Sequence, residues 1–202
     1  MKKLLFILLI LSQISVAQTK SSSKKLVILG DSLTEGYGVS KLSAFPSLLE
    51  KKLNQGSQKW EVLNSGVSGS TTASAVSRVR WMLNNKPDIV FIILGANDGL
   101  RGLKTNQSEK NLAEAIELSQ KEGVKVILGG LYTPPNYGKS YAEEFQTMYS
   151  KLAKKYKVHL VPFILEKVAG DSKLNQVDGI HPNEAGHKVI SETIYNSIKD
   201  KL

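Results

Sequence analysis

Five short apolar runs, separated by segments with helical periodicity, constrain the fold of this chain most strongly. Each run is rich in Val, Ile or Leu, the pattern of a strand that is buried on both faces. The runs are residues 26–29, 60–63, 89–94, 124–128 and 158–161. Because strands that alternate with helices form parallel sheets, the sequence predicts a single-domain, three-layer α/β/α fold. We expect a five-stranded parallel sheet in the flavodoxin-like order 2-1-3-4-5.

The segments between the runs carry apolar residues at helical spacing. The expected helices are residues 44–53, 71–84, 108–122, 141–156 and 184–201, with Ser140 as the cap of the fourth. Residues 171–179 are polar and are expected to be irregular.

The N-terminus has the pattern of a secretory signal peptide. Lys2 and Lys3 precede an unbroken apolar run at residues 4–11, and Ser15 and Ala17 are small residues at the positions that a signal peptidase reads. An uncleaved anchor is the weaker interpretation, because the apolar run is well short of the roughly 20 residues that a membrane span needs. We expect export to the periplasm or beyond, cleavage after Ala17 and no stable membrane insertion afterwards. The expected organisation is a signal peptide (1–17), a flexible leader (18–25) and one folded domain (26–202).

Composition excludes several classes of function. The formal charge of +9 comes from scattered lysines without an arginine-rich stripe, so we expect no nucleic-acid partner. The chain has no cysteine, which excludes disulfides, thiolate metal sites and a cysteine nucleophile. Three histidines without an HxxxH pair predict no metal site. The glycine-rich turns also lack the spacing of a dinucleotide or phosphate fingerprint, so no cofactor is expected.

Polar residues follow three of the expected strands at the edge where open α/β sheets bind ligands. Ser32 comes directly after Gly30-Asp31, where Asp31 favours a turn or a cap, and Gly69 and Asn97 follow the second and third strands. Ser32 is the candidate nucleophile. The backbone N–H groups of Ser32 and Gly69, together with the Asn97 amide, are a candidate three-donor oxyanion hole.

The candidate base lies before the last helix. Asp178 and His181 are three residues apart on a turn that Gly179 opens, so the carboxylate can reach one imidazole nitrogen and leave the other for Ser32. His159 and His187 are interpreted as structural residues. Taken alone, Ser32 could instead be only a helix cap. Asp98 is expected to be a turn residue that bonds nearby backbone, rather than the acid of a triad.

Two loops beyond the strand ends, residues 99–105 and 131–141, are rich in apolar side chains. The candidate substrate-binding residues on them are Leu100, Leu103, Tyr132, Pro134 and Tyr137. These side chains either cap the core or form an apolar groove for an acyl chain, with loops mobile enough to admit it.

Four blocks of residues resemble the conserved blocks of the GDSL (SGNH) hydrolases. They are Gly30-Asp31-Ser32-Leu33, Asn64…Gly69, Gly95-Ala96-Asn97-Asp98 and Asp178…His181. The resemblance implies that Ser32 is the nucleophile, His181 the base and Asp178 the residue that orients it. It also implies that Ser32, Gly69 and Asn97 form the oxyanion hole, with Gly66 as a rival for Gly69 that is interpreted as a turn residue.

Within that family, residues 97–102 and 135–138 look like the exported bacterial thioesterase I, lysophospholipase and arylesterase group. The expected activity is therefore that of a serine esterase that hydrolyses fatty acyl esters, thioesters, lysophospholipids or aryl esters through an acyl-enzyme on Ser32. The expected partner is a small-molecule or lipid acyl ester. A carbohydrate O-acetylesterase on the same scaffold is the alternative, and a non-catalytic ligand-binding module is a third reading.

Overall fold

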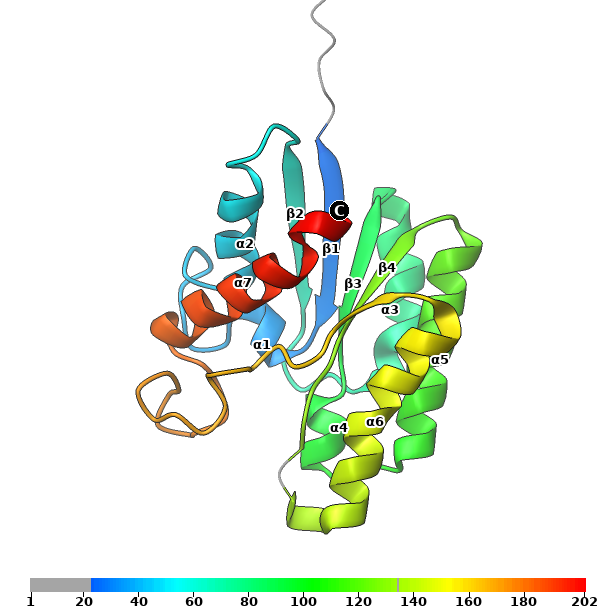
Figure 1. Ribbon diagram of the computed structural model, residues 1–202, viewed down its shortest axis with the longest axis vertical. Helices are drawn as coiled ribbons and strands as arrows, with labels where there is room; N and C mark the ends of the chain where they lie inside the picture. Colours follow the sequence, from blue (N-terminus) through cyan, green and yellow to red (C-terminus); the bar gives the residue numbers. More distant parts are fainter. Residues whose placement is uncertain (1–22, 134) are drawn as a thin grey trace, which may run out of the picture.

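The computed structural model describes residues 23–133 and 135–202, and in them it contains one five-stranded sheet (Figure 1). The strands are β1 (Lys24–Gly30), β2 (Trp60–Gly66), β3 (Ile89–Ile93), β4 (Lys125–Gly129) and β5 (His159–Val161). All neighbouring strands are parallel and the order is β2-β1-β3-β4-β5. This confirms the predicted fold class and the predicted strand order.

Helices cover both faces of the sheet. The main helices are α2 (Phe45–Leu53), α3 (Ala75–Met82), α5 (Thr105–Lys121), α6 (Lys139–Tyr156) and α7 (Glu184–Ile198). Helices α2 and α7 pack together on one face, and α3, α5 and α6 lie on the other (Figure 1). Because β3 lies inside the sheet and is covered on both faces, all five of its residues are buried.

Short helical segments complete the described chain. They are α1 (Ser32–Glu35), α4 (Ala96–Leu100), η1 (Thr72–Ser74), η2 (Leu83–Asn85), η3 (Pro135–Tyr137) and η4 (Lys199–Lys201). Helices α1 and α4 were not expected, since a single turn is too short to show helical periodicity. They matter for function, because each begins directly after a strand at the carboxyl edge of the sheet.

Some predicted boundaries differ from the structure. Strand β1 begins at Lys24, so Lys24 and Lys25 belong to the sheet rather than to the predicted leader. Helix α6 begins at Lys139 after Gly138, so Ser140 is not its cap; its hydroxyl contacts Glu144 within the first turn instead. The predicted signal peptide, the cleavage after Ala17 and leader residues 18–22 lie outside the described residues. Within the described ranges, no helix combines the length and apolar character that a membrane crossing requires.

Candidate active site

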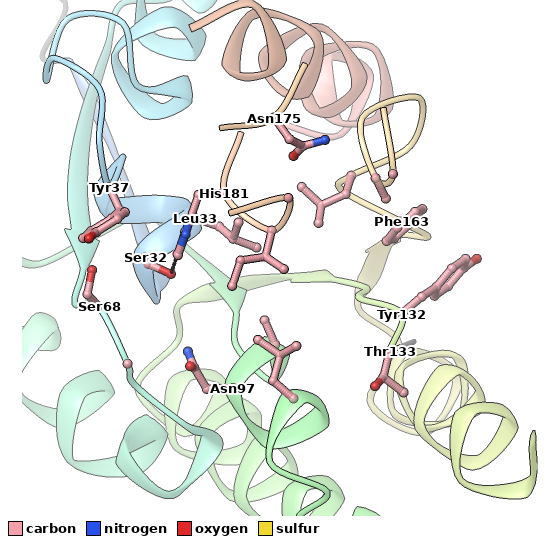
Figure 2. Close-up of a pocket in the computed structure, with 18 residues that line it drawn as sticks. Ser32, Leu33, Tyr37, Ser68, Asn97, Tyr132, Thr133, Phe163, Asn175 and His181 are labelled. Carbon is pink, nitrogen blue, oxygen red and sulfur yellow. Dashed lines mark hydrogen bonds between the residues drawn. The ribbon is translucent and has the colours of Figure 1, made fainter. Parts of the chain in front are cut away.

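Ser32 is held at the first position of α1 by the residue that precedes it. Asp31 is the N-cap of this helix, and its side chain accepts a hydrogen bond of 3.0 Å from the backbone N–H of Leu33. Ser32 is half-buried and lies at the end of β1, with its hydroxyl in the pocket at the sheet edge (Figure 2). Asp31 therefore has the capping role that the sequence predicted.

His181 joins Ser32 to Asp178. Its Nε2 lies 2.9 Å from Ser32 Oγ (Figure 2). Its Nδ1 lies 2.7 Å from Asp178 Oδ2. Ser32 and His181 are 149 residues apart, and their contact is made when the connection from β5 to α7 crosses to the end of β1. At the end of that connection Asn183 caps α7 by accepting hydrogen bonds from Ala185 and Gly186.

The charge on Asp178 is stabilised by its own turn. The backbone N–H of His181, the imidazole of His181 and the backbone N–H of Ile180 all bond the carboxylate, and together they lower the pKa of Asp178 to about 2. A carboxylate with this pKa is ionised throughout the neutral range, so it can hold the imidazole in one tautomer and stabilise the imidazolium.

The three residues of the predicted oxyanion hole, Ser32, Gly69 and Asn97, all line the pocket. Gly69 has a φ of +76° in the turn after β2, a conformation that favours glycine. Asn97, on α4, donates from Nδ2 to the backbone carbonyl of Ser70 at 3.1 Å, which ties the third strand end to the second. The backbone N–H groups of Ser32 and Gly69 donate to no acceptor within the described part of the chain. Figure 2 shows Asn97 across the pocket from Ser32.

Gly66 is not part of this group, and it is not the turn residue that was expected. It is the last residue of β2, and a Cβ there would lie 2.0 Å from the backbone nitrogen of Glu35 in α1. Its role is to let α1 pack closely on β2, and it does not line the pocket.

The pocket has a volume of about 430 Å³ and a largely apolar wall. Of the predicted substrate-binding residues, Leu100 and Tyr132 line it. Leu103 and Tyr137 do not, and Pro134 lies outside the described residues. Tyr137 instead braces the loop after α4: its hydroxyl donates to the Leu100 carbonyl at 3.2 Å and its ring covers Gly102.

Several lining residues come from segments that the sequence did not indicate. Phe163 stacks on Tyr132 with ring centroids 4.1 Å apart and forms the far end of the pocket with it (Figure 2). The other apolar lining residues that were missed include Leu33, Tyr37, Leu165, Ala169 and Ile180. Most of them belong to the connection from β5 to α7, which has no helical or strand periodicity and therefore gave no signal of a binding wall.

His159 and His187 are structural residues, as expected, and Asp98 is structural but has other partners than those expected. His187 is buried and its Nδ1 accepts the backbone N–H of Phe45 at 3.2 Å, while half-buried His159 contacts Ser197. Asp98 is buried and structural, but its partners are distant in sequence rather than nearby backbone. It accepts from the backbone and hydroxyl of Thr72 and from the hydroxyl of Ser108.

A second buried aspartate lies beside Ser32. Asp31 is fully buried, and burial raises its pKa to about 6 although Leu33 N–H bonds one oxygen and the half-buried Arg78 guanidinium is near. The other oxygen, Oδ2, has no hydrogen-bond partner among the described residues. The Arg78 guanidinium donates to the backbone carbonyls of Gly30 and Ser65, and not to Asp31 Oδ2. Across the described ranges, no three His, Asp or Glu side chains gather in a way that could hold a metal ion.

A flavodoxin-like sheet with a hydrogen-bonded serine, histidine and aspartate at its carboxyl edge is the arrangement of a serine hydrolase. Residues 28–189 match the GDSL-like Lipase/Acylhydrolase family. The chain therefore belongs to that family and is a carboxylic ester hydrolase.

Characterised relatives align with nearly the whole chain. Esterase TesA of Pseudomonas aeruginosa strain PAO1 is 38% identical over 96% of this chain and 94% of its own length. An arylesterase of Vibrio mimicus is 37% identical over 93% of this chain and 94% of its own. Thioesterase 1/protease 1/lysophospholipase L1 of Escherichia coli K12 is 36% identical over 93% of this chain and 86% of its own.

Solved structures agree with the fold. The crystal structure of TesA matches with a TM-score of 0.85 and 38% identity over 89% of this chain and 100% of its own. AlinE4, an esterase of the SGNH-hydrolase family, matches with a TM-score of 0.75 and 36% identity over 90% and 97% of the two chains.

Proposed function

We propose that Ser32 is the nucleophile of this esterase and that catalysis proceeds through an acyl-enzyme. Ser32 Oγ attacks the carbonyl carbon of an ester or thioester while His181 Nε2 takes the hydroxyl proton. The imidazolium then donates that proton to the leaving group. Water, activated by the same imidazole, attacks the acyl-enzyme and releases the acid. The observation that carries the proposal is the unbroken Ser32–His181–Asp178 line of hydrogen bonds, at 2.9 Å and 2.7 Å.

The oxyanion of the tetrahedral intermediate would be held by the backbone N–H groups of Ser32 and Gly69 and by the amide of Asn97. Each of these donors lies on the connection that follows a different strand, β1, β2 or β3, so the scaffold sets their spacing before substrate arrives. Preorganised donors of this kind stabilise charge where it develops, without reorganisation during the reaction.

We propose that the apolar end of the pocket takes the acyl chain of the substrate. The stacked Tyr132 and Phe163 lie at this end, and a volume of about 430 Å³ is within the range of small-molecule sites. Fatty acyl esters, acyl thioesters, lysophospholipids and aryl esters are the proposed substrates. The names of the relatives at 36–38% identity do not favour the carbohydrate O-acetylesterase alternative.

A fluorophosphonate probe tests the nucleophile. The wild type should be labelled once per chain, and Ser32→Ala should not be labelled. Ser68→Ala removes a second serine of the same pocket, whose hydroxyl bonds Glu35, and should keep the label. Labelling of Ser32→Ala would refute Ser32 as the nucleophile. No labelling of a folded wild type would favour a ligand-binding role.

A series of p-nitrophenyl esters tests the acyl site. Because the wall is apolar, octanoate should be hydrolysed at least as efficiently as acetate. A sharp preference for acetate would favour the O-acetylesterase alternative instead.

We also propose that the chain is exported, with residues 1–17 removed, and that the hydrolase domain begins at β1. The support is the charged N-terminus followed by the apolar run and the small residues before Gln18. Mass spectrometry of the exported protein should find Gln18 as the first residue. An intact N-terminus on that protein would contradict cleavage.

A further inference from the structure

The turn that carries Gly69 is exposed, so hydrogen bonds rather than core packing set its position. Val67, Ser68 and Gly69 are all exposed. The Ser70 N–H donates to the Val67 carbonyl at 3.2 Å, and Gly69, the third residue of the four, has a φ of +76°. These are the features of a type II turn. The peptide at its centre joins Ser68 to Gly69 and contains the Gly69 N–H, one of the proposed oxyanion donors.

Two neighbouring elements hold this turn by its backbone. At its start, the Val67 N–H donates to the Gly30 carbonyl of β1 at 3.2 Å. From the side of α4, Arg101 donates to the Gly69 carbonyl at 3.2 Å and Asn97 donates to the Ser70 carbonyl at 3.1 Å. These bonds tie the turn to β1 and to the connection after β3, but they do not tie it to α1, on which Ser32 lies.

Glu35 makes the side-chain link between α1 and this turn. The backbone nitrogen of Ser68 lies 2.8 Å from Glu35 Oε2, and the Ser68 hydroxyl donates to the same oxygen. Hydrogen bonds to an ionised carboxylate are stronger than those between neutral groups. Ser68 lines the pocket, and Figure 2 shows it at the end of the pocket away from Tyr132 and Phe163. Glu35 therefore holds the residue directly before Gly69.

Helix α1 brings both backbone donors of the proposed oxyanion hole into one bonded unit. Its first residue is Ser32 and its last is Glu35. The helix packs closely on the end of β2, where a Cβ on Gly66 would meet the backbone of Glu35, and Asn64 donates to the Thr34 carbonyl at 2.8 Å. A single helical turn thus carries one donor at its start and holds the turn with the other donor at its end.

We propose that Glu35 is a positioning residue, which sets the place of the Gly69 N–H relative to the Ser32 N–H. The inference rests on the proposed function, because it concerns the oxyanion of that reaction. Without the carboxylate, the exposed turn loses its side-chain link to α1, and the Gly69 N–H is less well preorganised for the oxyanion. Glu35 does not line the pocket and lies outside the four blocks of residues that resemble the hydrolase family.

Steady-state kinetics with a p-nitrophenyl ester test this role in the full chain. Glu35→Ala should lower kcat about tenfold, which is less than the roughly 10²–10³ expected when an oxyanion donor is removed. KM should change by less than about twofold, because the ground-state contacts of the substrate remain. Glu35→Gln keeps a carbonyl acceptor without the charge and should stay within about threefold of the wild-type kcat. Glu122→Ala removes an exposed acid at the end of α5 and should leave both constants unchanged.

Ser68 offers a second variant on the other side of the same contact. Ser68→Ala removes the hydroxyl but keeps the backbone N–H, so kcat should fall only about threefold. The double variant of Glu35→Ala and Ser68→Ala should be no slower than Glu35→Ala, because both substitutions remove one contact. The urea midpoints of these variants should match that of Glu122→Ala, since all the substituted side chains are exposed.

Four results would overturn the positioning role. They are a kcat of Glu35→Ala equal to that of Glu122→Ala, an equal loss in Glu35→Gln, a raised KM with unchanged kcat, and a lowered urea midpoint in Glu35→Ala. Hydrolysis and fluorophosphonate labelling that persist in Ser32→Ala would refute the proposed function and the positioning role with it. If Ser32→Ala is inactive and Glu35→Ala behaves like Glu122→Ala, the positioning role alone is refuted.

Discussion

The connections after β1 and β3 lie side by side at one sheet edge, and each places a polar pocket residue next to a buried aspartate. After β1 the pair is Ser32 and Asp31, and after β3 it is Asn97 and Asp98. Asp98 receives three hydrogen bonds from Thr72 and Ser108, so its burial is compensated. Asp31 receives one from Leu33 and leaves an oxygen without a partner.

The difference shows how two similar turns divide their tasks. Asp98 links α4 to η1 and α5, and so it holds the scaffold of the site together. Asp31 keeps Ser32 at the start of α1 but retains a carboxyl group that is costly to ionise. The turn after β3, which holds Asp98, therefore contributes stability. In the turn after β1, a cost in stability accompanies the placement of the proposed nucleophile, Ser32.

The largest expected effect is on kcat, and it distinguishes Asn97 from its neighbour Asp98 in the connection after β3. Asn97→Ala removes one donor to the proposed oxyanion and should lower kcat by about 10²–10³. Its free energy of unfolding should change by less than about 1 kcal/mol, because the half-buried amide makes one bond, to Ser70. Steady-state kinetics with a p-nitrophenyl ester and urea unfolding measure the two quantities. An unchanged kcat would remove Asn97 from the oxyanion hole.

Asp98→Ala should have the opposite profile. It leaves the backbone and hydroxyl of Thr72 and the hydroxyl of Ser108 without their buried acceptor, which should lower the free energy of unfolding by about 3 kcal/mol. Urea unfolding measures the loss, and Asp171→Ala, a substitution of an exposed acid, is the matched control. A loss no larger than that of the control would mean that the network does not support the scaffold.

The pH dependence of stability in Asp31→Asn tests the cost of ionising the buried carboxyl group after β1. The folded-state pKa of Asp31 is about 6 and its ordinary value is 3.8, so the folded protein binds the proton more tightly. The stability contribution of Asp31 is therefore present below about pH 4 and is lost as the pH rises through 6. Asparagine caps helices but does not ionise.

The free energy of unfolding of Asp31→Asn, relative to that of the wild type, should therefore increase by up to about 3 kcal/mol between pH 3.5 and pH 8. Urea unfolding of both proteins at several pH values measures this difference. Asp178, whose lowered pKa contributes stability that is lost as the pH falls from about 4 to 2, is present in both proteins and cancels. A difference that does not vary with pH would contradict a raised pKa for Asp31.

The smallest effect concerns the loop that follows α4. Tyr137→Phe removes the hydrogen bond to the Leu100 carbonyl but keeps the ring over Gly102. Because Tyr137 is half exposed, thermal unfolding should show a loss of only about 0.5–1 kcal/mol. The chain-length profile with p-nitrophenyl esters should stay unchanged, since Tyr137 does not line the pocket. A changed profile would return Tyr137 to the substrate-binding residues.

The sequence predicted more of the reactive end of the pocket than of its apolar end. Ser32, His181 and Asp178 were predictable because each lies at a recognisable turn. The spacing of three residues also lets the Asp178 carboxylate reach the His181 imidazole within one turn. Of the predicted substrate-binding residues, Tyr132 and Leu100 line the pocket. Phe163 and Ile180 were missed because their connection has no helical or strand periodicity to show which way its side chains face. Tyr137 does not line the pocket, and its ring lies over Gly102 of the neighbouring loop. The sequence could not show this, because an aromatic residue on a loop can face either a ligand or another loop.

By itself, the sequence determined the alternation of buried strands and amphipathic helices, and with it the parallel sheet and the edge at which the polar turns meet. These properties follow from local patterns of apolar residues and from the handedness of crossover connections. Only the tertiary structure decided which side chains touch across long separations: His181 with Ser32, Asp98 with Thr72, and Phe163 with Tyr132. The physical reason is that loop paths depend on the packing of the whole core, which no local pattern encodes.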